Sequence, residues 1–61
     1  MITTREALKV RVKDRYRLRS CRLLQRVLEC TLRTGSVLLV HYKPMEGELI
    51  EVTQYQWIEA K

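Results

Sequence analysis

The residues with the clearest chemical potential are six cations at alternate positions of LKVRVKDRYRLRS, residues 8–20. They are Lys9, Arg11, Lys13, Arg15, Arg17 and Arg19. In a β-strand, residues two apart share one face at about 6.6 Å spacing, which is comparable to the spacing of phosphates along a nucleic-acid strand. Lys and Arg that neutralise phosphates give affinity that is independent of sequence and sensitive to salt. We therefore expect a cationic ribbon that contacts the backbone of DNA or RNA, extended by Arg22 and Arg26.

Charge is distributed unevenly along the 61 residues. Residues 1–33 hold ten of the twelve Lys and Arg residues against three acidic ones, a net of +7, whereas residues 34–61 have a net charge of −2. Such asymmetry favours a surface that faces a polyanion. An acidic protein partner is the alternative to nucleic acid, and a solvated charged face is the structural alternative.

No catalytic signature is present: the sequence has no nucleophile elbow, phosphate loop or metal cluster. His41 is the sole histidine and lies within an expected strand. We therefore expect a non-enzymatic protein without cofactor or metal. No apolar run approaches the ~20 residues of a membrane span and no signal peptide opens the chain, which predicts a cytoplasmic protein.

The elements that must position these cations follow from hydrophobic periodicity. Strict alternation over residues 7–19 predicts a strand, or a hairpin that turns near Asp14. Residues 20–34 place their apolar side chains on one face of a helix, with Ser20 as N-cap and Gly35 at the C-terminal end. Residues 36–58 predict a β-hairpin around Pro44–Gly47.

The expected fold is therefore one small α+β domain over residues 1–61, in the order β(β)-α-β-β. It has an antiparallel sheet of three or four strands and one amphipathic helix. A winged-helix-like DNA binder, with residues 4–14 helical and the C-terminal hairpin as the wing, is the weaker alternative.

A homodimer is expected because the apolar face of the helix is wider than one sheet needs. The aromatic residues of the C-terminal strands would join this face, since Tyr and Trp are enriched at the hot spots of protein interfaces. The expected interface residues are Leu23, Val27, Tyr42, Tyr55 and Trp57. Tyr16 would face the core and would not stack on a base. Cys21 and Cys30, nine residues apart in the expected helix, would be about 13 Å apart along its axis, too far for a disulfide.

The stretch LLQRVLECTLRTGSVLLVHYKPMEGELIEV, residues 23–52, resembles the opening helix and hairpin of WYL-type regulatory domains of bacteria. The likeness lies in a Leu-rich helix, a strand ending in His41–Tyr42, a glycine-containing turn and a second strand. The Trp-Tyr-Leu signature of that family is absent. The resemblance implies a fragment of a regulator.

Overall fold

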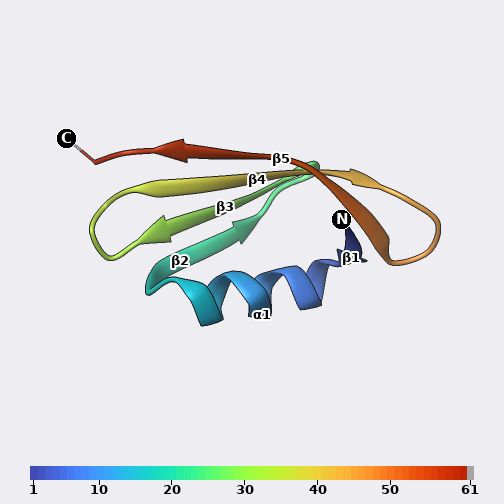
Figure 1. Cartoon of the computed structure of the whole chain (residues 1–61), viewed down its shortest axis with the longest axis horizontal. Coiled ribbons are helices and arrows are strands. Elements are labelled where there is room, and N and C mark those ends of the chain that lie inside the picture. Colours follow the sequence, from blue (N-terminus) through green and yellow to red (C-terminus); the bar gives the residue numbers. More distant parts are fainter. Residues whose placement is uncertain (61) are drawn as a thin grey trace.

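The structure, a computed structural model that describes residues 1–60, is a five-stranded sheet curled over one short helix (Figure 1). The elements in chain order are β1 (Ile2–Thr4), α1 (Arg5–Arg15), β2 (Leu18–Leu23), β3 (Val27–Leu32), β4 (Val37–Pro44) and β5 (Leu49–Ile58). All neighbouring strands are antiparallel, in the order β1-β5-β4-β3-β2. The expected α+β fold of three or four strands is wrong, because the chain is mostly β and forms a half-barrel.

The basic segment is a helix for most of its length, so the strand or hairpin expected over residues 7–19 is wrong up to Arg15. Thr4 caps α1, its Oγ1 accepting a hydrogen bond from the Ala7 N–H at 3.1 Å. Leu8 and Val12, four residues apart, are buried, whereas Val10 between them is 57% exposed. The helical spacing of four residues, rather than the alternation of a strand, therefore describes which side chains are buried. The sheet covers only the face of the helix that carries Leu8 and Val12. The structure agrees with the winged-helix-like alternative in the helical residues 5–14 and in the C-terminal hairpin, but no second helix lies within residues 1–60.

The helix expected over residues 20–34 is also wrong, because the segment forms β2 and β3. A short turn at residues 24–26 joins the two strands and shifts the phase of their alternation. Two alternating runs with shifted phase imitate the three-and-four spacing of a helix. In β3 the inward side chains are buried and the outward ones half-buried, which is the period of a strand.

The cysteines change their relationship as a result. Cys21 and Cys30 are directly paired positions of β2 and β3, and their Sγ atoms lie 3.6 Å apart. Both thiols are free. The separation of about 13 Å expected from a helix is therefore wrong.

The antiparallel hairpin expected over residues 36–58 is present as β4 and β5. Gly47 at its turn has a φ of 62°, and Gly35 in the turn before β4 has a φ of 95°, a region that glycine enters without strain. The ladder shifts register between His41 and Tyr42, and such a bulge increases the local twist and bend of a sheet. Figure 1 shows that β5 bends strongly along its length.

The core lies between α1 and the concave face of the sheet. Its buried side chains are Leu8, Val12, Leu28, Cys30, Leu32, Leu38, Val40, Tyr42, Ile50 and Val52. Tyr42 is 3% exposed and its hydroxyl donates to the Leu24 carbonyl at 2.6 Å. Tyr42 is thus a core residue, and its expected place in an interface is wrong for this structure.

Candidate nucleic-acid interface

The six alternating cations do not form one ribbon, because α1 distributes them around its circumference. Lys9, Arg11, Lys13 and Arg15 are carried by the helix, whereas Arg17 and Arg19 lie in the entry to β2. Helical geometry turns about 100° per residue, so Arg11 and Arg15 lie on one flank of the buried stripe and Lys9 and Lys13 on the other. The structure therefore divides the expected ribbon into separate groups.

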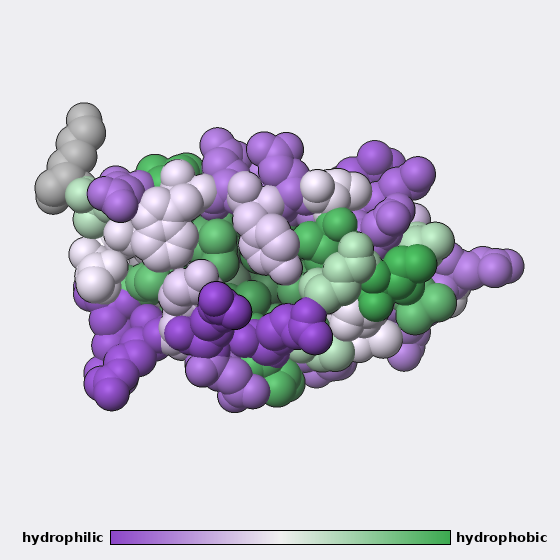
Figure 2. Space-filling model, viewed as in Figure 1, coloured by the Kyte–Doolittle hydropathy of each residue, from purple (hydrophilic) through white to green (hydrophobic). Residues whose placement is uncertain are grey.

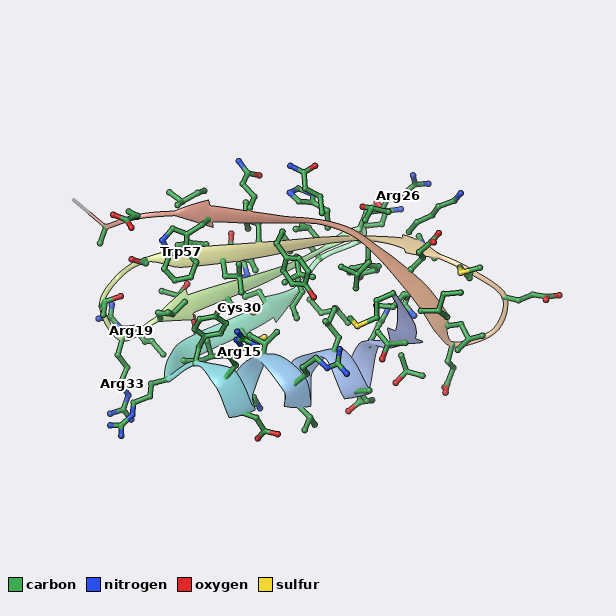
Figure 3. All side chains as sticks on the ribbon, in the orientation of Figure 1. Arg15, Arg19, Arg26, Cys30, Arg33 and Trp57 are labelled. Carbon is green, nitrogen blue, oxygen red and sulfur yellow. The ribbon has the colours of Figure 1, made fainter. Side chains whose placement is uncertain are left out.

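One group faces a pocket between α1 and the last strand, which we call the α1–β5 groove. It has a volume of about 360 Å³ and is lined by Arg11, Val12, Arg15, Tyr16, Leu38 and Tyr55. The lining combines two guanidinium groups with two phenol rings over an apolar floor. Figure 3 shows Arg15 on the side of α1 that faces the sheet, with Trp57 on the strand opposite.

The aromatic side chains of β5 lie on the concave face of the sheet. Tyr55 pairs with Val40 and Trp57 with Leu38, and both partners are buried on that face. Tyr55 is nevertheless 55% exposed and Trp57 44% exposed. This part of β5 is an edge of the sheet, because β1 pairs only with residues 49–51. The ring centroids of Trp57 and Tyr16 are 5.9 Å apart, so Tyr16 supports Trp57 from the helix side.

A second group of cations surrounds the C-terminal end of α1, which we call the basic end. Its pocket of about 430 Å³ is lined by Lys13, Tyr16, Arg17, Leu18 and Arg33. Backbone pairing brings the segments together, since the Arg33 N–H donates to the Arg17 carbonyl at 3.1 Å. Arg19 Nη2 also donates to the Arg33 carbonyl at 3.3 Å. Arg19 and Arg33 lie side by side at this end in Figure 3.

The two sites are neighbours, because Tyr16 lines both the α1–β5 groove and the basic end. Strongly hydrophilic side chains gather near the helix and at this end of the molecule in Figure 2, with paler side chains of the sheet above them. The linings of the two pockets together contain five cations and the rings of Tyr16 and Tyr55. Arg19 lies beside Arg33, and Trp57 packs against Tyr16.

These cations lack carboxylate partners within the described chain. Among residues 1–60 the recorded ion pair is Arg22 with Glu29, at 3.7 Å. Arg22 pairs with Glu29 on the outer face of the sheet. Arg26 lies in the β2–β3 turn, at the opposite end of the molecule from Arg19 and Arg33 (Figure 3). The helix expected over residues 20–34 would have held Arg22 and Arg26 one turn apart, as an extension of the cationic strand. That placement is wrong, because the segment forms β2 and β3.

The sequence did not predict that two residues, Arg33 and Tyr16, belong to this surface. Arg33 is twenty residues from Lys13 in the chain, and only the pairing of β2 with β3 brings it close. Tyr16 was expected in the core, but it closes α1 as the C-cap and is only half-buried. Its spacing from Leu8 and Val12, four residues at each step, was the available signal of a helical stripe.

The apolar residues expected to form a dimer interface do not share one surface. Leu23 lies on the edge strand and is 42% exposed, whereas Val27 lies half-buried on the outer face of β3. The wide helical face that predicted a dimer is absent, since residues 20–34 are not helical. The oligomeric state stays a prediction.

His41 lies on the outer face of β4, where its Nε2 is 3.1 Å from Gln56 Oε1. Within residues 1–60, no group of three His, Cys, Asp or Glu side chains could hold a metal ion. No helix of this described part has the length and apolar character needed to cross a membrane.

No family model, curated protein or solved structure significantly matches the chain. The helix that supported the resemblance to WYL-type domains is replaced by β2 and β3.

Proposed function

We propose that this protein is a non-enzymatic nucleic-acid-binding protein that contacts the phosphate backbone through the basic end and the flanking cations of α1. The contacts come from Lys13, Arg17 and Arg33 at the basic end and from Arg11 and Arg15 at the α1–β5 groove. Such a protein would act as a cytoplasmic regulator by occupying nucleic acid.

The observation that carries this proposal is the convergence of Arg17 and Arg33. The two residues come from separate segments whose backbones are joined by a hydrogen bond of 3.1 Å. Both side chains are exposed and line the same pocket. Like charges brought together repel one another. An anion placed between them relieves this repulsion, and guanidinium groups match phosphate oxygens in geometry.

The affinity for a fluorescent oligonucleotide, measured by anisotropy against salt concentration, tests the proposal. Five cations that contact a single strand should give a slope of about −3.5 in a plot of log K against log salt. No detectable binding at low salt would overturn nucleic-acid binding and would leave an acidic protein partner as the reading of the basic surface.

A pair of charge-matched variants separates a local site from net charge alone. Arg17→Gln with Arg33→Gln should reduce the slope by about 1.4, because each lost phosphate contact removes about 0.7. Arg22→Gln with Arg26→Gln removes the same charge from the opposite end and from the outer face, and should leave the slope nearly unchanged. Equal losses in both double variants would contradict a site at the basic end.

A further inference from the structure

Tyr55 and Trp57 are large aromatic side chains on the concave face that the described chain covers only in part. They are separated by one residue on the same face, which places their backbones about 6.8 Å apart. Their exposed fractions of 55% and 44% contrast with their cross-strand partners Val40 and Leu38, which are buried on the same face. Tyr55 lines the groove, and Trp57 lies beside it, packed against Tyr16 of the same lining. Exposed aromatic rings offer π-faces to a planar ligand.

The charge around these rings indicates the class of ligand. Arg11 and Arg15 line the same groove as Tyr55, and no carboxylate of residues 1–60 pairs with either guanidinium. The groove also adjoins the basic end, since Tyr16 lines both. A ligand that suits both parts must carry planar rings and a row of negative charges, which is the chemistry of a nucleic acid.

The groove suits single-stranded nucleic acid better than a duplex. A duplex keeps its bases paired and stacked, so it can offer phosphates to the basic end but no free base face to Tyr55 or Trp57. A pocket of about 360 Å³ accommodates an unstacked base. Stacking of bases on aromatic side chains, together with a positively charged path for the backbone, is the general mode by which proteins bind single strands.

We propose that the α1–β5 groove receives unstacked bases of single-stranded nucleic acid on Tyr55 and Trp57, while Arg11 and Arg15 hold the adjoining phosphates. This proposal rests on the proposed function and adds the form of nucleic acid that is bound. Trp57 carries the exposed ring that Tyr16 supports from behind, at 5.9 Å between ring centroids.

Trp57 is the single tryptophan of the sequence, so its fluorescence reports directly on the groove. The full chain is titrated with oligo-dT, oligo-U, a mixed-sequence duplex of equal length and heparin, which is a polyanion without bases. Both single strands should quench Trp57 through stacking, whereas the duplex and heparin should bind with little quenching. Equal quenching by oligo-dT and oligo-U would show that binding requires neither the 2′-hydroxyl nor the thymine methyl group.

A series at Tyr55 separates stacking from structural effects. Tyr55→Leu should weaken binding of single strands about tenfold and leave heparin binding unchanged, whereas Tyr55→Phe, which keeps the ring, should retain wild-type affinity. Gln54→Leu adds the same side chain to the outer face of the same strand and should have no effect. Circular dichroism checks that each variant is folded. If Tyr55→Leu is not folded, the quenching of Trp57 by single strands but not by duplex still tests stacking in the wild-type protein.

The two levels of the hypothesis fail in different ways. Absence of binding to every polyanion overturns the proposed function itself. Binding of duplex and single strand with equal affinity, without quenching and without sensitivity to Tyr55→Leu, retains phosphate binding but overturns base stacking in the groove.

Discussion

The Sγ atoms of Cys21 and Cys30 lie 3.6 Å apart across the directly paired positions of β2 and β3. Cys30 is completely buried in the core. Desolvation by this burial, assisted by hydrogen bonding to Cys21, raises the pKa of Cys30 to about 12. The distance of 3.6 Å between the Sγ atoms is short enough for the two thiols to react with each other. The raised pKa keeps Cys30 in its unreactive protonated form at neutral pH.

We expect a thiol oxidant such as diamide to join Cys21 to Cys30 within one chain, slowly at neutral pH and faster as pH rises. Paired positions of antiparallel strands have Cα separations of about 4.5–5.5 Å, which a disulfide can span. Mass spectrometry should show the loss of two hydrogens in a monomer. Oxidation that yields only covalent dimers, in wild type as in Cys21→Ser, would contradict this pairing.

Stability should fall at alkaline pH because of Cys30. The thiol of the unfolded chain ionises near 9.0, whereas the pKa in the folded state is raised to about 12. Between these values the unfolded state loses the proton first, so the free energy of unfolding decreases as pH rises, by up to ~1.4 kcal/mol per pH unit. Urea midpoints of wild type and Cys30→Ala, measured across this window, should converge with rising pH; a constant difference would exclude a role for ionisation of Cys30.

Substitutions in α1 distinguish a helix from the alternating strand that the sequence suggests. Leu8→Ala should destabilise the protein by about 2–5 kcal/mol, because Leu8 is 1% exposed and its removal leaves a cavity. Val10→Ala should change stability by less than about 0.5 kcal/mol, since Val10 faces solvent. In a strand both side chains would occupy the same face, so equal losses in urea denaturation would refute the helix.

Loss of the Thr4 cap should also lower stability. Thr4→Ala removes the acceptor of the hydrogen bond from Ala7 and should cost about 1 kcal/mol. Thr4→Ser retains the hydroxyl and serves as the control. The melting temperatures of both variants are compared with that of wild type. A melting temperature of Thr4→Ser as low as that of Thr4→Ala would show that the methyl group of Thr4, rather than its hydroxyl cap, stabilises the protein.

The sequence by itself determined the features that depend on neighbouring residues. The hairpin of β4 and β5 follows from two runs rich in β-branched and aromatic residues on either side of Pro44–Gly47. The positive φ at Gly35 and Gly47 follows from local turn chemistry. Tyr55 and Trp57 share a strand face because alternation is a local property of extended backbone.

The tertiary structure decided which periodicity is used and which distant residues meet. Residues 8–18 contain both a period of two and a spacing of four at Leu8, Val12 and Tyr16, and the helix forms because a concave sheet covers that stripe. Residues 20–32 contain a helical spacing that arises from two strands joined out of phase. The meeting of Arg17 with Arg33, and of Arg15 with Tyr55, depends on strand pairing and sheet curvature. Both bring together parts of the chain that are distant in sequence, and a periodicity within one segment carries no information about such contacts.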